Sequence, residues 1–117
     1  MGVDFHCHTF FSLDAYGTPE DLVASASKAG VTTIAVTEHN CLRSIIPARK
    51  AALKSGVKFF PAVELDVFFG KIHFHLLGFG IAPRNSRLLN LAEQNRRNLK
   101  FIMTCLFRRG FDCHVKK

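Results

Sequence analysis

Five of the chain's six histidines lie in three short segments, each at the end of an apolar run: His6-Cys7-His8, Glu38-His39-Asn40 and His73-Phe74-His75. Neutral imidazoles and carboxylates are ligands of Zn²⁺, Mn²⁺ and Fe²⁺, and a mixed set of nitrogen and oxygen donors does not choose among these ions. The residue types and their clustering therefore indicate a metalloenzyme.

The two histidines of the first segment are spaced so that both could bind one metal ion. Successive side chains of an extended strand point to opposite faces, so His6 and His8 share a face while Cys7 points away. Asp4 lies on the same face and is predicted to accept a hydrogen bond from the second ring nitrogen of a ligand, which would fix its tautomer. The alternative is a pair of polar residues on the solvated face of a strand.

Length and composition limit the class of protein. With 117 residues, of which 48% are hydrophobic, the chain suffices for one small domain with a core. Its four cysteines lack Cys-x-x-Cys spacing, so neither a zinc knuckle nor a thioredoxin-like pair is indicated. Because the sequence shows no leader pattern and no apolar run long enough to span a bilayer, we expect a cytoplasmic protein without membrane contact.

The net charge of +7 is concentrated in the last third of the chain, where basic residues greatly outnumber Glu93 and Asp112. A basic surface attracts phosphorylated ligands and nucleic acid. We therefore predict that Arg96, Arg97 and Lys100 contact substrate phosphates. A solvated helix face rich in arginine and lysine is the alternative.

Strands and helices are predicted to alternate along the chain. Strands are expected over residues 2–8, 31–37 and 57–67, the last broken or bulged near Pro61. The run Thr18-Pro19-Glu20-Asp21 is typical of a helix start, and that helix should stop at Gly30. A second helix is expected over residues 47–54, with Gly56 as its stop.

A hairpin and a long helix should follow. The turn Phe69-Gly70-Lys71 predicts pairing of residues 63–68 with 72–77. Period-two counting places Glu64 with Asp66 and His73 with His75, so that Glu64 and His75 meet at one site. Residues 86–109 are predicted to form a helix closed by Gly110, with these apolar residues toward a core: Leu88, Leu91, Ala92, Leu99, Ile102, Met103 and Leu106.

The strand and helix order, with candidate ligands at carboxyl ends of strands, is typical of barrel and open α/β enzymes. From about Val3 to Gly80 the sequence resembles the polymerase and histidinol phosphatase (PHP) superfamily. The arginine-rich helix ending at Gly110-Phe111 resembles its stand-alone phosphoesterase branch. Four motifs in order support the resemblance: Asp4-Phe5-His6-Cys7-His8-Thr9 with Ser12-Leu13-Asp14, Thr37-Glu38-His39-Asn40, Ala62-Val63-Glu64-Leu65 and His75-Leu76-Leu77-Gly78.

The resemblance implies an α/β fold, namely part of a distorted seven-stranded β/α (TIM-like) barrel that holds two or three divalent metals and cleaves phosphate esters. Residues 1–83 would be the amino-terminal part of the barrel and residues 84–117 a basic helical segment. A metal-activated water would attack, so no side-chain nucleophile is required. Six metal ligands are implied: His6 and His8 on the first metal, Glu64 bridging the first and second, His75 on the second, and Asp14 and His39 on the third.

Several further residues are predicted to support these ligands. Asp4, Glu38 and Asn40 are candidates for the surrounding shell, and Asn40 and Thr9 could also touch substrate. The family usually has aspartate where this chain has Glu38, and we expect the extra methylene to move the carboxylate outward and weaken ligand orientation. His73 matches no ligand position and is predicted to lie on the surface or beside a ligand.

Family members of this branch are about twice as long or longer and have a further histidine and an Asp-x-His pair near the carboxyl terminus. Asp112-Cys113-His114 imitates that pair but directly follows the long helix, so we interpret it as coincidence. We therefore expect an incomplete metal site, weak or absent activity from this chain alone, and self-association through the open barrel edge.

Three functions remain open from the sequence. The first is a metal-dependent phosphoesterase acting on nucleotides or short oligonucleotides. The second is a non-catalytic metal-binding or interaction module. The third is the PHP domain of a bacterial DNA polymerase, although the Thr18-Pro19-Glu20 helix start favours the first.

Overall fold

A computed structural model describes residues 2–108 of the chain, and the side chains of residues 2–100. Gly110, the predicted helix stop, and the Asp112-Cys113-His114 run lie outside the described residues. The elements follow in this order: β1 (Gly2–Cys7), α1 (Pro19–Lys28), β2 (Val31–Val36), α2 (Ile45–Ser55), β3 (Lys58–Phe69), β4 (Ile72–Phe79) and α3 (Ser86–Arg108).

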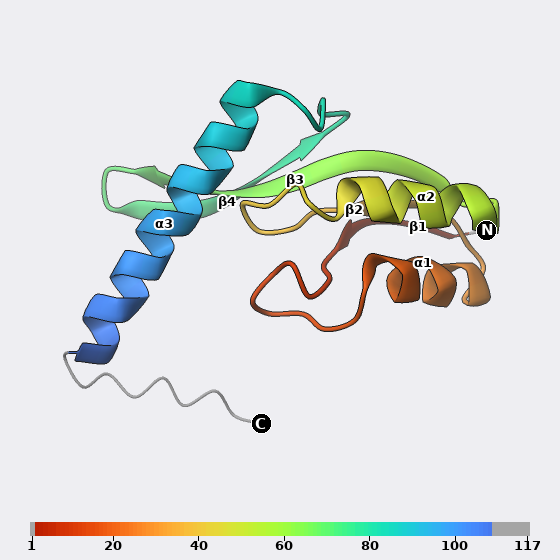
Figure 1. Cartoon of the computed structure of the whole chain (residues 1–117), viewed down its shortest axis with the longest axis horizontal. Coiled ribbons are helices and arrows are strands. Elements are labelled where there is room, and N and C mark those ends of the chain that lie inside the picture. Colours follow the sequence, from red (N-terminus) through yellow and green to blue (C-terminus); the bar gives the residue numbers. More distant parts are fainter. Residues whose placement is uncertain (1, 109–117) are drawn as a thin grey trace.

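The four strands form one sheet in the order β1-β2-β3-β4. β1, β2 and β3 are parallel, whereas β3 and β4 form an antiparallel hairpin closed by Gly70 and Lys71. Figure 1 shows α1 and α2 beside the parallel strands and α3 crossing the hairpin at the other end. The chain is thus a mixed α/β fold with a curled four-stranded half-barrel, consistent with part of the expected barrel. The division at residue 83 stays a prediction.

The predicted break of β3 near Pro61 is wrong. β3 runs without interruption through twelve residues. Lys58–Pro61 pair with β2, and Ala62–Phe69 pair with β4. Pro61 is the last residue paired with β2, so its missing N–H falls where that ladder ends.

The helix boundaries follow local capping chemistry. The Thr18 hydroxyl accepts from the backbone N–H of Asp21, and the Asp21 carboxylate accepts from the backbone N–H of Thr18, which confirms the predicted start of α1. α2 begins at Ile45, two residues before the predicted start at Pro47. The first N–H groups of a helix have no partner within it, so proline fits the first turn. Gly56, at φ 67°, ends α2 as predicted.

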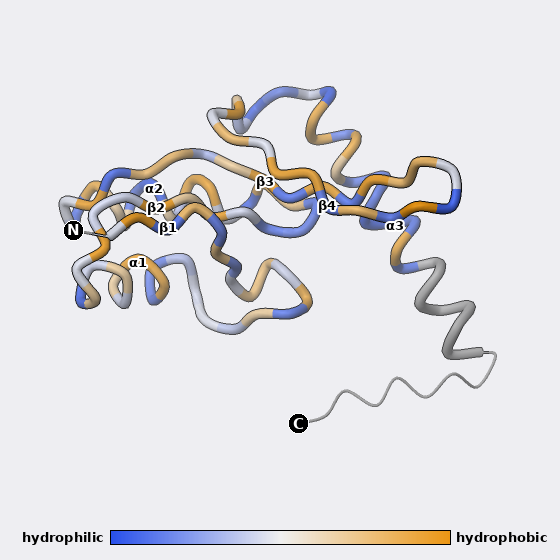
Figure 2. Tube along the Cα trace, turned by 180° about the vertical axis from the view of Figure 1, so that it is seen from behind, coloured by the Kyte–Doolittle hydropathy of each residue, from blue (hydrophilic) through white to orange (hydrophobic). Residues whose placement is uncertain are grey.

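Two apolar clusters fix the helices to one face of the sheet. The first joins α1 and α2 to the parallel strands: Cys7, Val23, Ile34, Ala52 and Val57. The second joins α2, β3 and α3: Leu42, Ile45, Val63, Leu65 and Ala92. Figure 2 shows hydrophobic and hydrophilic residues alternating along α3. The prediction that Leu91 lies in the core is wrong, because its side chain is 43% exposed. Its neighbour Ala92 is buried, as predicted.

The other face of the sheet holds polar chemistry. Val63 and Leu65 pack against helices, so Glu64 and Asp66, which alternate with them along β3, point to the opposite face. On that face Phe5 contacts the rings of Phe60 and Phe79 edge to face. Among the described helices, none has both the length and the apolar character needed to cross a membrane.

Candidate metal centre and substrate cavity

Glu64 is the centre of the polar face. Its side chain is 2% exposed. Its backbone N–H donates to the carbonyl oxygen of Glu38 (3.1 Å), and its own carbonyl accepts from the N–H of Asn40 (2.8 Å). The segment that follows β2 therefore holds the backbone of Glu64 on both sides and fixes where the carboxylate points.

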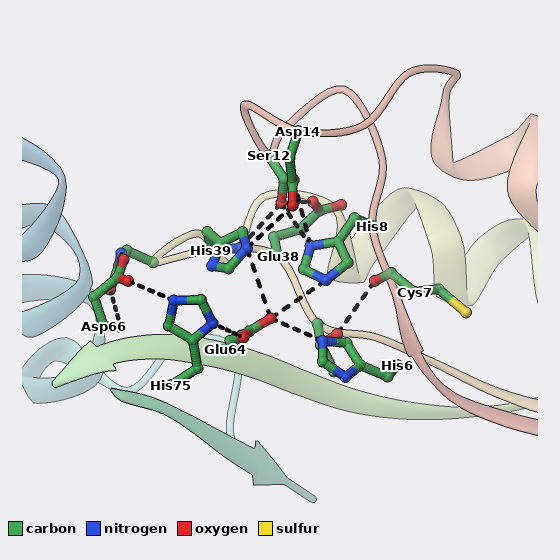
Figure 3. A network of polar contacts seen from close by, with 12 residues as sticks. His6, Cys7, His8, Ser12, Asp14, Glu38, His39, Glu64, Asp66 and His75 are labelled. Carbon is green, nitrogen blue, oxygen red and sulfur yellow. Dashed lines mark hydrogen bonds and ion pairs between the residues drawn. The ribbon is translucent and has the colours of Figure 1, made fainter. Parts of the chain in front are cut away.

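Four imidazoles surround this carboxylate (Figure 3). Oε2 of Glu64 lies 2.9 Å from Nε2 of His6, 3.3 Å from Nε2 of His8 and 3.8 Å from Nε2 of His39. Oε1 lies 2.6 Å from Nδ1 of His75. The predicted meeting of Glu64 and His75 is confirmed, as is the shared face of His6 and His8.

Asp14 completes the set of six predicted ligands from the loop between β1 and α1. Its side chain is 57% exposed, with Oδ2 at 3.3 Å from Nε2 of His39 and Oδ1 at 3.8 Å from Nδ1 of His8. The structure thus brings all six side chains into one cluster, in which their roles as metal ligands stay predictions.

The donor set fits divalent metals. Imidazole nitrogens and carboxylate oxygens lie within 4.8 Å of one another in three groups made up entirely of these six residues. Such donors suit Zn²⁺, Mn²⁺ and Fe²⁺ alike. The three groups are His6, His8 and Glu64; His8, Asp14 and His39; and His39, Glu64 and His75.

Glu38 supports the cluster from a fully buried position. Its carboxylate accepts hydrogen bonds from the backbone N–H of Thr9 (3.2 Å), the Thr9 hydroxyl (2.5 Å) and the Ser12 hydroxyl (2.5 Å). The Ser12 oxygen in turn accepts from the backbone N–H of His39 (3.0 Å) and lies 3.2 Å from Nδ1 of His8. The carboxylate of Glu38 therefore points inward, against the loop that follows β1. The expectation that its extra methylene would move it outward is wrong.

Burial lowers the pKa of His8 below its ordinary value of 6.5, and the neighbouring His39 lowers it further, against the opposing charges of Asp14 and Glu64. The surroundings thus favour the neutral imidazole. Metals bind the neutral form, so this shift prepares His8 for coordination.

Asp4 has partners on its own strand. Its Oδ1 accepts from the backbone N–H of His6 (3.2 Å). Burial, followed by a hydrogen bond from the thiol to Asp4, raises the pKa of Cys7 to about 12. Cys7 and Cys41 are buried free thiols. The hydrogen bond predicted from a ligand imidazole to Asp4 stays a prediction.

Asp66, on the hairpin side of the cluster, is a buried carboxylate for which no role was predicted. Its Oδ1 lies 3.1 Å from Nε2 of His75 and 2.9 Å from Nε2 of His73. The Asn40 side chain donates to Oδ2 of Asp66 and accepts from its backbone N–H (3.1 Å). Asn95 of α3 donates to the Asn40 side chain and to the Asp66 carbonyl oxygen, both at 2.9 Å.

Sequence reasoning could have singled out Asp66, because period-two counting already placed it beside Glu64. Asn95 had no local signal, since its contacts exist only because α3 crosses the hairpin. His73, half-exposed and in contact with Asp66, lies beside a predicted ligand, as expected.

A cavity of about 950 Å³ adjoins the cluster. Its lining includes Asp14, His39 and His75 of the cluster, together with Asp66. Basic side chains line it as well: Arg43, Arg96, Arg97 and Lys100. Arg43, which the sequence did not single out, stacks its guanidinium 4.7 Å from the ring centroid of Phe11. The contact of the α3 residues with substrate phosphates stays a prediction.

The chain is similar in sequence to a known protein family and to several of its members. The model of the PHP domain matches residues 4–114. A 3',5'-nucleoside bisphosphate phosphatase from Chromobacterium violaceum is 31% identical over 86 residues, covering 74% of this chain and 30% of the relative. The 5'-3' exoribonuclease Rnm of Escherichia coli is 34% identical over 97 residues, covering 80% of this chain and 33% of the relative. The chain thus spans about a third of the length of these relatives.

A solved structure from Bifidobacterium adolescentis, described as a metal-dependent phosphoesterase, superimposes with a TM-score of 0.83 at 26% identity. The match covers 99% of this chain and 41% of that one. The four motifs in order, the half-barrel and the family match over almost the whole sequence agree, and the chain belongs to the PHP domain family.

Proposed function

We propose that the protein is a metal-dependent phosphoesterase that hydrolyses phosphate esters of nucleotides or short oligonucleotides. One observation supports this most directly. The buried Glu64 carboxylate, ringed by four imidazoles, lies next to a cavity that is lined by both the cluster and four basic side chains. A site for divalent cations beside a site for anions suits a phosphate ester.

The predicted ligands would divide among the metals as the family resemblance implies. His6, His8 and Glu64 would hold the first ion, Glu64 and His75 the second, and Asp14 and His39 the third. Bound divalent metals supply Lewis acidity, which lowers the pKa of water and offsets the charge of the phosphate.

The chain's own residues would orient the substrate. Guanidinium groups bind phosphate oxygens in a planar, bidentate manner, so Arg43 and Arg96 are suited to hold the phosphate against the cluster. Phe11, Leu13 and Leu89 line the same cavity and offer apolar surface to a nucleoside. Glu38 and Ser12 would keep His8 and His39 in place while substrate enters.

The relatives support the reaction class. They are a phosphatase named for nucleoside bisphosphates and an exoribonuclease, both hydrolases of phosphate esters. Because the chain covers about a third of each, turnover by these residues alone is part of the proposal. Self-association is proposed too, since β1 and β4 are the outer strands of the described sheet and their open edges can pair.

The test is phosphate release by the purified full chain from a nucleoside 3',5'-bisphosphate and from a short oligonucleotide. We expect weak release with Mn²⁺ or Zn²⁺, because the chain spans about a third of its relatives, and this release should be abolished by EDTA and restored by excess metal. Glu64→Gln is the matched inactive control, because it keeps the shape and removes the charge. Metal binding without any release would instead support the non-catalytic module.

A further inference from the structure

His75 lies between two buried carboxylates. Its Nδ1 is 2.6 Å from Oε1 of Glu64, and its Nε2 is 3.1 Å from Oδ1 of Asp66. A neutral imidazole has one N–H and one lone pair, so it can donate to only one of the two carboxylates. The other ring nitrogen of a neutral imidazole presents its lone pair to a negative oxygen, an arrangement that a cation between them would make favourable.

The distribution of donors decides on which side that cation belongs. Three further imidazole nitrogens, of His6, His8 and His39, lie within 3.8 Å of Glu64. On the other side, the second oxygen of Asp66 already accepts a hydrogen bond from Asn40. A metal therefore gains most donors at Nδ1, and the proton belongs on Nε2.

We propose that Asp66 is a positioning residue for the metal centre. Its Oδ1 accepts the Nε2–H of His75, which leaves the Nδ1 lone pair directed at Glu64 as a metal ligand. Such outer carboxylates fix the tautomer and ring orientation of a ligating histidine and raise its basicity. This inference rests on the proposed metal site, and it assigns to Asp66 a role that the sequence motifs did not indicate.

Asp66 is itself held by two elements. The side chain of Asn40 both donates to the Asp66 carboxylate and accepts from its backbone N–H. Asn95 of α3 donates to the Asn40 side chain and to the Asp66 carbonyl oxygen. The helix that lines the substrate cavity is thereby connected through Asn40 and Asp66 to the imidazole of His75.

A competing arrangement makes the opposite demand on His75. Asp66, His73 and His75 also form a group with ligand atoms within 4.8 Å of one another. An ion held by these three residues would need the lone pair of His75 on Nε2. The proton would then lie on Nδ1 and donate to Glu64. The two arrangements therefore require opposite tautomers.

The tautomer of His75 is the first test. The full chain, labelled with ¹⁵N-histidine and loaded with Zn²⁺, would be studied by long-range ¹H–¹⁵N correlation, with His75→Gln to assign its signals. We expect the Nε2–H tautomer. A dominant Nδ1–H tautomer in the zinc-loaded chain would overturn the proposal.

Zinc affinity is the second test, measured by competition with a chromophoric chelator. We expect Asp66→Asn to weaken binding by about 10–100-fold, as for other outer partners of metal-bound histidines. His73→Ala, which removes the other imidazole on the same carboxylate oxygen, is the matched control and should stay within about twofold.

Unchanged affinity in Asp66→Asn would overturn the proposal, as would the loss of one zinc equivalent in His73→Ala. If Asp66→Asn does not fold, as judged by thermal unfolding, the tautomer measurement on the unmodified chain decides. A wild-type chain that binds no zinc would contradict the proposed function, an outcome distinct from zinc binding that Asp66→Asn leaves unchanged.

Discussion

On each side of Glu64 a second buried carboxylate supports an imidazole, but the two sides do so in different ways. On what we call the loop flank (His8, Ser12 and Glu38), a buried carboxylate reaches an imidazole through a hydroxyl. On the hairpin flank (Asp66, His73 and His75), a buried carboxylate contacts the imidazoles directly. The His8 side chain is 17% exposed, whereas that of His75 is 45% exposed.

The difference lies in what holds each carboxylate. Glu38, which follows β2, accepts from Thr9 and Ser12, and both of these residues belong to the loop that follows β1. Asp66 depends on Asn40 and on Asn95 of a distant helix. The loop flank therefore needs only the neighbouring parallel strands β1 and β2 to pair, whereas the hairpin flank also needs α3 to dock.

Removing the residue that both flanks share should have the largest effect. Glu64→Ala deletes the carboxylate that contacts four imidazoles, and we expect zinc affinity to fall by more than about 100-fold, beyond the usual effect of an outer partner. Metal content after dialysis, measured by elemental analysis, checks this. His73→Ala is the control, and equal metal content in the two variants would contradict the assignment of Glu64.

Breaking the loop flank alone should have the next largest effect. Ser12→Ala removes the hydroxyl between Glu38 and His8 and leaves a buried carboxylate with one partner fewer. We expect about 1–3 kcal/mol lower free energy of unfolding, together with about tenfold weaker zinc binding. Urea denaturation and chelator competition measure the two effects. Ser12→Thr, which keeps the hydroxyl, should recover part of both.

Substitutions on the cavity side of α3 should have a smaller effect, on oligonucleotide binding, that grows with each residue replaced. Replacing Arg96, Arg97 and Lys100 by glutamine should weaken oligonucleotide binding and flatten its dependence on salt. The log-log slope should fall by about 0.7 for each lost contact with a single strand. Fluorescence anisotropy at several salt concentrations measures the slope. An unchanged slope would mean that these residues form only a solvated face.

The smallest effect concerns pH and separates the buried His8 from its more exposed counterparts. Because burial lowers the pKa of folded His8 below 6.5, the unfolded chain takes up that proton first as pH falls. His8 therefore contributes stability above pH 6.5 that is lost at lower pH. Urea denaturation of the metal-free protein at pH 7.5 and 5.5 should show a smaller loss for His8→Gln than for wild type. An equal loss in both would contradict this.

Local pattern was enough for the elements and for the faces of the strands. Period-two alternation placed His6 with His8 and brought Glu64 to His75, because side chains of a strand must alternate and the hairpin register follows from its turn. Local rules failed at Pro61, where a strand that changes its neighbour tolerates a missing N–H. They also misplaced Leu91, because only the stripe of α3 that contains Leu88 and Ala92 packs against the second apolar cluster.

The sequence by itself determined the family, the order of strands and helices, and the six residues predicted to bind metal, because each is encoded in motifs of a few neighbouring residues. Only the tertiary structure decided how those residues are supported. Ser12 joins Glu38 to His8, and Asn95 joins α3 to Asp66, through contacts between segments far apart in the chain. Such contacts follow from how the helices pack on the curled sheet, a property of the whole fold that no short stretch of sequence specifies.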